Sequence, residues 1–531
     1  MDTKEKTGYK RIIDFFTEKR VGIAIAVLFA VSLIPIIYVG FFNYASGDDY
    51  WYGTYTYRGY VEEGISGALQ GSVRMVREFY QNWQGTWFTM FLFTLSPNHF
   101  WEKGYSIVVF LSLGLLTASV SLLANQYLVK KLKFGRGTVA AMTCMVLYLA
   151  LQYIPRTTSG IYWFNGIMHY SVPFFLGAAA LVCTQRFVEE KKKKDYILLF
   201  ICFTLLGGGS YLAPVAATLA ACLILLSRLE IKEIDIRQRK LILNYDWRNL
   251  WVLAAFAAEL TGLLISFLAP GNSVRGGEEF GFSLKWALQC IVYAIDRGIY
   301  LGEDYFLKNP VTTIFYLMLA VILWQQMWKV DKEKYKFRYP LLFVVYMNGI
   351  YWASYTPEIY SRSDVSGGVP NTYFHIFLLI TLASMIYVHG WVQRKLWLRW
   401  EKQAAEQGIG TKELAKTKLL YGEGFKHYLG GRLLAVGILA FLTVGQYSDI
   451  ITTNEYCLEA IESGQLQKYA GVRRQQHQIL MDENVEEALI PEMEAPYPLL
   501  HMVLSDDETM SRNVDRAKYY HKTSVKAYRV D

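Results

Sequence analysis

Long apolar runs recur along this chain, and they constrain its fold more than any other feature. The first begins at Val21, and polar or basic loops separate each run from the next. Because a helix needs about 20 apolar residues to cross a bilayer, runs of this kind predict membrane-spanning helices. The expected spans are residues 21–42, 105–124, 138–152, 169–187, 196–206, 211–227, 250–268, 311–328, 340–352, 373–389 and 433–447.

Composition supports a multi-pass membrane protein. Hydrophobic residues make up 53% of the 531 residues and charged residues 19%, whereas soluble domains are about one quarter charged. The net charge of +8 does not indicate nucleic-acid binding, since the basic residues form short clusters between apolar runs. The six cysteines show no C-x-x-C spacing, so the sequence predicts neither a disulfide framework nor a metal site, and it calls for no cofactor.

The distribution of basic residues predicts how the chain is oriented in the membrane. About two thirds of the 54 lysines and arginines fall on one side when the loops are assigned alternately. That side includes the basic N-terminal stretch, which we interpret as a retained anchor. The positive-inside rule then places the N-terminus in the cytoplasm, and an odd number of spans places the C-terminus outside a cell membrane.

The remaining polar segments fall on the outer side of this topology. Residues 43–103 form the first outer loop, in which apolar residues at helical spacing over 63–80 predict an amphipathic helix lying in the membrane interface. Residues 448–531 are expected to form a small α/β extracytoplasmic segment. The predicted fold is therefore an all-α polytopic membrane protein with about eleven spans, in which residues 1–447 form the transmembrane domain and 448–531 the C-terminal segment.

Two adjacent acids follow the first span. Asp48 and Asp49 lie in the stretch Ser46–Tyr52, among aromatic residues at the expected membrane surface. Paired carboxylates repel each other and are costly to desolvate, so this placement favours an active site that needs negative charge. Burial raises a carboxylate pKa and makes it a better general base at neutral pH. The alternative is a solvated loop beside an interfacial aromatic belt.

Arginines in the outer loops supply the opposite charge. Arg275 ends the turn 269–275, which also contains Asn272, and Arg362 and Arg156 occupy two other outer loops. A guanidinium beside free backbone amides can receive a phosphate group. Ordinary salt bridges to outer acids remain the alternative for these arginines.

Aromatic and amide groups near the outer surface suit a sugar. Trp163, Asn165, His169 and Tyr50 combine ring faces, against which sugar C–H groups stack, with partners for hydroxyl groups. The alternatives are again the aromatic belt and, for the histidine, an interfacial hydrogen bond. Glu259 is the one acid well inside an expected span, and its role stays open.

The pattern resembles the integral-membrane C-type glycosyltransferase superfamily. The resemblance rests on the motif Gly47–Tyr50 just outside the first span, the long first outer loop, about eleven spans and an outer C-terminal segment. It implies transfer of a sugar from a polyprenyl-phosphate carrier to an extracytoplasmic glycan or polymer acceptor, usually with inversion. Asp48 or Asp49 would then act as base and Arg275 or Arg362 would stabilise the phosphate. No extra carboxylate cluster is evident, which favours metal-independent chemistry.

Three other readings remain open at this point. A transporter or lipid flippase needs many spans, but such proteins often show repeated halves and several deep charges. A polymer ligase would move a whole glycan from a diphosphate lipid and would use several outer arginines. A non-enzymatic assembly subunit would show no activity alone.

Overall fold

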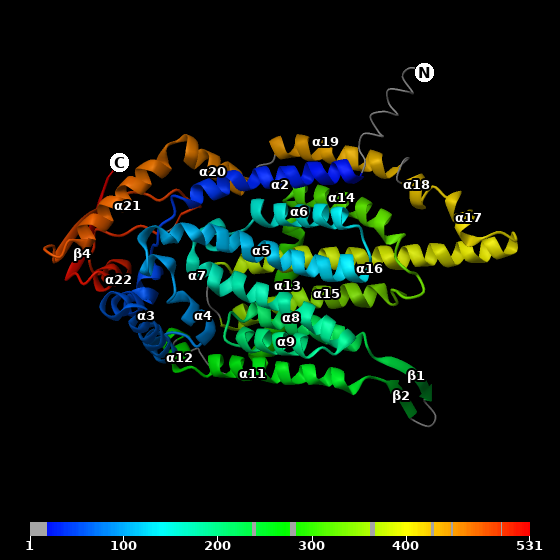
Figure 1. Ribbon diagram of the computed structural model, residues 1–531, viewed down its shortest axis with the longest axis horizontal. Helices are drawn as coiled ribbons and strands as arrows, with labels where there is room; N and C mark the ends of the chain where they lie inside the picture. Colours follow the sequence, from blue (N-terminus) through cyan, green and yellow to red (C-terminus); the bar gives the residue numbers. More distant parts are fainter. Residues whose placement is uncertain are drawn as a thin grey trace, which may run out of the picture.

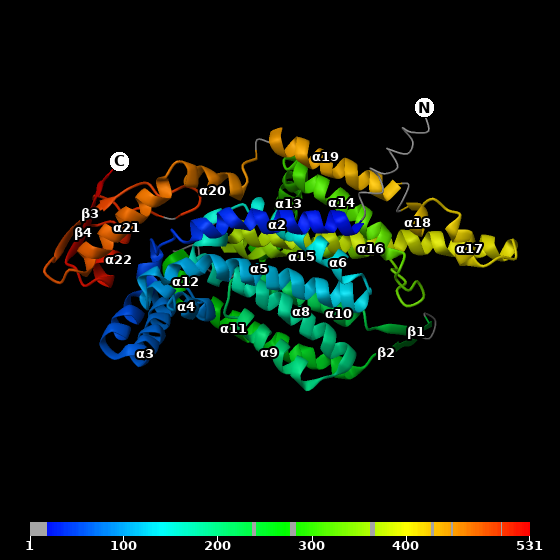
Figure 2. The same cartoon turned by 45° about the horizontal axis from the view of Figure 1, so that its top comes forward.

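The computed structural model describes residues 18–235, 240–276, 283–361, 367–425, 429–447, 450–500 and 502–530. Most of these residues are helical. Figures 1 and 2 show an elongated bundle whose long helices run roughly parallel to one another. The helix α3 (Asp48–Asn82) and the C-terminal elements gather at one end of the bundle, and the hairpin of β1 (Glu230–Asp235) and β2 (Lys240–Asn244) lies at the other.

The long apolar runs form the helices of the bundle. Six helical segments of the described chain are long and apolar enough to cross a membrane, which confirms the multi-pass class. Their central helices are α2 (Glu18–Gly40), α5 (Val108–Ala124), α8 (Val172–Glu190), α11 (Val252–Phe267), α14 (Pro310–Met327) and α16 (Val369–Glu406). The other expected spans fall on α6 (Arg136–Gln152), α9 (Lys193–Leu206), α10 (Leu212–Leu226), α15 (Pro340–Ser361) and α19 (Gly431–Tyr447). That all eleven cross the membrane stays a prediction.

The first outer loop is more helical than expected. Asp48 and Asp49 lie in the first turn of α3 (Asp48–Asn82) rather than in an extended loop, where acids interact favourably with the helix dipole. Gly64 breaks the helix with a φ of 67°. The two halves then pack so closely that a Cβ on Gly67 would lie 2.1 Å from the carbonyl oxygen of Gly59. α3 is therefore a helical hairpin, and α4 (Trp87–Phe93) follows it.

An apolar stripe marks the outer surface of this hairpin. Ile65, Leu69 and Val73 follow one another at intervals of four residues in the arm after Gly64, and each side chain is strongly exposed. Residues four apart share a helix face, so these side chains form one continuous apolar strip. This exposure supports the expectation that the hairpin lies against a membrane surface.

The segment between the expected spans 250–268 and 311–328 contains two helices. α12 (Pro270–Gly276) forms a short turn, and α13 (Leu284–Leu307) packs along α15. A Cβ on Gly298 of α13 would lie 2.3 Å from the indole ring of Trp352. Charged residues are interspersed among apolar residues along α13, so its sequence contains no long apolar run that would have predicted it.

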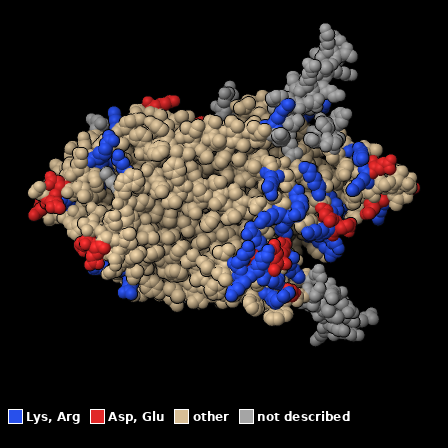
Figure 3. All heavy atoms as spheres, viewed as in Figure 1, with Lys and Arg blue, Asp and Glu red and all other residues tan. Residues whose placement is uncertain are grey.

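Figure 3 shows where charges gather on one face of the molecule. Lysines and arginines concentrate at the end that carries β1 (Glu230–Asp235) and β2 (Lys240–Asn244), and a broad uncharged surface separates them from the opposite end. The antiparallel hairpin of these two strands was not expected from the all-α prediction. The charge distribution agrees with the basic loops of the predicted cytoplasmic side.

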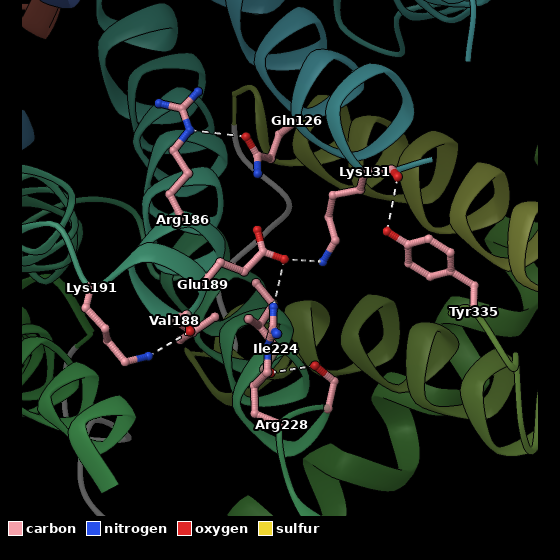
Figure 4. A network of polar contacts seen from close by, with 10 residues as sticks. Gln126, Lys131, Arg186, Val188, Glu189, Lys191, Ile224, Arg228 and Tyr335 are labelled. Atoms are coloured by element: carbon pink, nitrogen blue, oxygen red, sulfur yellow. Dashed lines mark hydrogen bonds and ion pairs between the residues drawn. The ribbon is translucent and has the colours of Figure 1, made fainter. Parts of the chain in front are cut away.

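A network of ion pairs joins helix ends at this basic side (Figure 4). The carboxylate of Glu189 accepts hydrogen bonds from Lys131 at 3.0 Å and from Arg228 at 2.8 Å. The hydroxyl of Tyr335 donates to the backbone carbonyl of Lys131 at 3.0 Å. These contacts tie the ends of α5, α8 and α10 to the loop before α15.

The C-terminal segment, residues 450–530, forms a small α/β unit, which we call the C-terminal cap. It contains α20 (Thr453–Glu462), α21 (Gln465–Met481), α22 (Ser511–Tyr519), and the parallel strands β3 (Glu487–Glu492) and β4 (Ser524–Arg529). The cap packs against α3, so these two regions of the chain lie together at one end of the bundle.

Candidate functional site

A large polar cavity opens between α3, α12, the loop 152–170 and the C-terminal cap. Its volume is about 940 Å³, within the range of small-molecule binding sites. Of the ten residues expected at the site, six line this cavity: Asp48, Arg156, Trp163, Asn165, His169 and Arg275. Sequence reasoning therefore identified residues that the fold brings to one place.

Asp48 presents its carboxylate to the cavity. The side chain is half-buried and accepts no hydrogen bond from a residue that the structure describes. Burial raises the pKa of Asp48 above its usual value, while the positive charges of Arg512 and Arg275 act in the opposite direction. The result is an acid in the cavity wall that accepts no hydrogen bond from a described residue and on which two guanidinium groups act electrostatically.

Asp49 lies behind the cavity wall rather than in it. Its side chain is fully buried, and Oδ2 accepts hydrogen bonds from the hydroxyl of Tyr105 at 2.6 Å and from the backbone N–H of Ser46 at 3.0 Å. Burial raises the pKa of Asp49 to about 7, although these two bonds and the indole N–H of Trp163 favour the charged form. The two acids thus have different environments.

Arg275 reaches the cavity from α12. Its guanidinium donates to the side-chain oxygen of Gln84 and lies over the ring of Trp83, 4.9 Å from the ring centre. Asn272 does not line the cavity. Its side chain instead bonds the carbonyl of Ser266 at 2.7 Å and the N–H of Gly85 at 3.3 Å, which fixes α12 against the loop after α3. Asn272 therefore positions Arg275.

Arg156 enters the cavity from the opposite wall. The backbone N–H of Arg156 donates to Asn371 at 2.8 Å, and its carbonyl accepts from the same side chain at 2.9 Å. Its guanidinium is exposed and makes no hydrogen bond or ion pair with a described residue. The backbone is fixed while the charge remains available to a ligand.

The remaining wall suits a polyhydroxylated ligand. Asn165 is 1% exposed, and neither the oxygen nor the nitrogen of its side-chain amide has a hydrogen-bond partner among the described residues. His169 bonds the hydroxyl of Thr89 through Nδ1 at 2.9 Å. The rings of Trp163 and Tyr170 complete this side of the cavity. An unsatisfied buried amide beside aromatic faces can bind hydroxyl groups of a stacked ring.

The other residues that the sequence singled out do not line this cavity in the described structure. Tyr50 points into a separate pocket beside the C-terminal cap. Arg362 lies outside the described residues. Glu259 is buried in α11 and accepts from the hydroxyl of Thr218 on α10, and neither residue lines the polar cavity.

A second, apolar cavity of about 250 Å³ lies deeper in the bundle. α8 and the residues just before it border both cavities. Tyr170, before the first turn of α8, lines the polar cavity, and Phe174, Gly177 and Leu181 on successive turns line the apolar cavity. α16 contributes Ile376 and Ile380 to the same apolar wall. A polar cavity followed by an apolar one suits a ligand with a polar head and a hydrocarbon tail.

Sequence reasoning missed the contribution of the C-terminal cap. Tyr456, Tyr497 and Met502 line the polar cavity, and Arg512 of α22 acts on Asp48 electrostatically. These residues lie at the opposite end of the chain from Asp48, and no local pattern in the sequence indicates their proximity.

Within the described ranges, no group of three or more histidine, cysteine, aspartate or glutamate side chains is placed to hold a metal ion. Comparison with protein-family models, with curated proteins and with solved structures finds no significant match for this chain. The argument for function therefore rests on the geometry of the site.

Proposed function

We propose that this protein is a membrane glycosyltransferase that moves a sugar from a polyprenyl-phosphate carrier to an extracytoplasmic acceptor hydroxyl, with Asp48 as the general base. One observation carries the proposal. An unpaired carboxylate faces the polar cavity near Arg275 and Arg512, in a wall that also offers an unsatisfied amide and aromatic rings. This transfer requires an acid as base, cations for the phosphate, and a surface that binds a sugar.

The charges define a role for each side chain. Asp48 accepts the proton of the acceptor hydroxyl as its oxygen forms a bond to the anomeric carbon. The bond from that carbon to the phosphate oxygen breaks, and the electron pair stays on the departing polyprenyl phosphate. Arg275 and Arg156 offset the charge that grows on this phosphate. Attack opposite to the leaving group inverts the anomeric centre.

The arrangement of the two cavities supports a lipid carrier. The polar cavity would hold the sugar and phosphate, and the apolar cavity along α8 would receive part of the isoprenoid tail. The membrane surface expected at the α3 hairpin would keep the rest of the tail in hydrocarbon. We place the site on the extracytoplasmic side, since it lies at the end of the bundle opposite to the concentration of basic residues.

Asp49 has a supporting role in this proposal. It is buried and bonded to Tyr105 and Ser46, so it cannot reach an acceptor without rearrangement of α3. Its interaction with the indole N–H of Trp163 couples it to the cavity wall. We therefore assign the base to Asp48 and the orientation of Trp163 to Asp49.

The test is transfer from a panel of polyprenyl-phosphate-linked hexoses and pentoses by purified protein in lipid nanodiscs. Asp48→Asn keeps the shape of the side chain and removes the base, and we expect transfer to fall by about 10²–10⁴-fold. Asp506→Asn, an exposed acid on the C-terminal cap, is the matched control and should transfer normally. Full transfer by the folded Asp48→Asn variant would remove this residue from catalysis.

A polymer ligase that uses a diphosphate-lipid donor is the second candidate. The free guanidinium of Arg156 and the additional charge of Arg512 favour it, because two phosphates need more cations than one. Transfer of a preassembled glycan from a diphosphate lipid, without use of monophosphate donors, would select this activity. Lipid or glycan uptake by liposomes with no transfer product would instead select a transporter.

A further inference from the structure

A second pocket lies between the α3 hairpin and the C-terminal cap, and we call it the cap pocket. Its volume is about 200 Å³, and it shares no lining residue with the polar cavity. Arg473 of α21 and Arg516 of α22 form its buried side, and tyrosine rings of α3 and α22 surround them. The proposed transfer reaction uses none of these groups.

Arg516 forms no ion pair with a carboxylate among the described residues, and Glu492 acts on it only electrostatically. Its side chain is 2% exposed, and its guanidinium lies over the ring of Tyr50 at 3.6 Å from the ring centre. It makes no hydrogen bond or ion pair with any residue that the structure describes, and its buried Nε–H is without an acceptor. Burying an arginine in this way is costly unless an anion compensates its charge.

A second guanidinium lies in the same pocket. Arg473 donates to the carbonyl of Ala45, to Gln476 at 2.8 Å and to the hydroxyl of Tyr50 at 3.2 Å. These acceptors are all neutral, and no carboxylate is among the described residues that line the pocket. Glu492 lies nearby, but its oxygens accept from the backbone N–H groups of Met493 and Leu504. Glu492 acts electrostatically on both arginines, but its one negative charge cannot balance the two positive charges of Arg473 and Arg516.

The mouth of the pocket is apolar. Val61, Phe100 and Trp101 line it and are 66%, 39% and 64% exposed. Val61 stands at the end of the first arm of the α3 hairpin, and the apolar stripe of Ile65, Leu69 and Val73 begins just beyond the break at Gly64. An apolar mouth on a hairpin that also carries such a stripe suits the expected membrane surface, where headgroups are the available anions.

We propose that the cap pocket binds the phosphate of an anionic lipid headgroup, with Arg516 as its principal ligand and Arg473 behind it. The planar guanidinium of Arg516 offers several N–H donors to the phosphate oxygens. The apolar mouth contacts the glycerol and the first part of the acyl chains, which remain outside the pocket. The site would attach the C-terminal cap and the α3 hairpin to the membrane beside the polar cavity.

The experiment measures lipid binding to the full chain, so its result does not depend on sugar transfer. Native mass spectrometry in detergent compares short-chain phosphatidylglycerol, short-chain phosphatidylcholine and inorganic phosphate. The wild type should retain one phosphatidylglycerol more tightly than phosphatidylcholine. Arg516→Gln should weaken phosphatidylglycerol binding about tenfold or more. Arg474→Gln, an exposed arginine of the same cap, is the matched control and should bind normally.

Two further variants keep the test decisive. Arg516→Lys retains the charge and should bind more tightly than Arg516→Gln. If Arg516→Gln does not fold, Trp101→Ala removes an exposed side chain at the mouth and should weaken lipid binding. Unchanged binding by a folded Arg516→Gln variant would overturn the site. Inorganic phosphate that binds as tightly as phosphatidylglycerol, or equal binding of the two lipids, would overturn the assignment to an anionic headgroup.

Discussion

The buried acid Asp49 should make the stability of this protein depend on pH. In an unfolded chain its carboxyl releases its proton near pH 3.8, whereas in the folded protein burial raises the pKa to about 7. Between these two values the folded state holds a proton that the unfolded state has lost. Raising the pH through this range therefore removes stability, and the contribution is fully lost above about pH 7.

The size of the effect follows from the two pKa values. A pKa raised from 3.8 to about 7 corresponds to roughly 4 kcal/mol in the free energy of unfolding. Roughly 2.5 kcal/mol of this should be lost between pH 5 and pH 8. Asp49→Asn replaces the carboxyl by an amide that does not titrate, so this part of the pH dependence should disappear. The amide oxygen can still accept from Tyr105 and Ser46.

The assay is the free energy of unfolding in mixed micelles, measured by denaturing-detergent titration at pH 5, 6, 7 and 8. The quantity of interest is the difference between Asp49→Asn and the wild type, because other titrating groups cancel in it. This difference should move in favour of the variant as the pH rises. Asp506→Asn, which changes an exposed acid, should show no such trend. Parallel pH curves for the wild type and Asp49→Asn would refute the reasoning and indicate that Asp49 stays charged in the fold.

Two other substitutions test how the scaffold is held together. Gly67→Ala should destabilise the α3 hairpin by about 1–3 kcal/mol, because the new Cβ would lie 2.1 Å from the carbonyl oxygen of Gly59. Gly471→Ala, which has open space around it, is the control, and a smaller loss in Gly67→Ala than in this control would contradict the close approach. Glu189→Gln should cost about 1–2 kcal/mol, because it leaves Lys131 and Arg228 without a shared anion at a partly exposed site. Thermal unfolding at low and high salt should show a loss that shrinks at high salt, and a salt-independent loss would exclude the electrostatic explanation.

The sequence predicted the helices of the bundle well and the local form of the loops poorly. Apolar composition is a direct consequence of crossing a bilayer, so each expected span falls on a helix. α13 escaped prediction because it buries one side against α15 and carries charges along its length. The first outer loop was predicted as an interfacial helix from about residue 63, but the break at Gly64 makes it a hairpin that begins at Asp48.

At the candidate site, too, residue type could be used for prediction, whereas tertiary contacts could not be predicted. Charge and aromatic type at the outer loops were sufficient to select Asp48, Arg156, Arg275 and His169, all of which line one cavity. The sequence could not separate Asp48 from Asp49, since that distinction depends on which helix face meets the core. Nor could it place Arg512 near the acids, because the cap reaches them only through tertiary packing.

Three consecutive residues at the start of α3 explain why this stretch is central to the molecule. Successive residues of a helix point about 100° apart, so Asp48, Asp49 and Tyr50 must face three directions. Asp48 faces the polar cavity, Asp49 contacts Tyr105 in the core, and Tyr50 lies between Arg473 and Arg516 of the C-terminal cap. A single helical turn therefore fixes the proposed base relative to both the transmembrane core and the cap. Because the three side chains share one rigid turn, a ligand that holds the cap arginines in place also restricts the position of the carboxylate in the cavity.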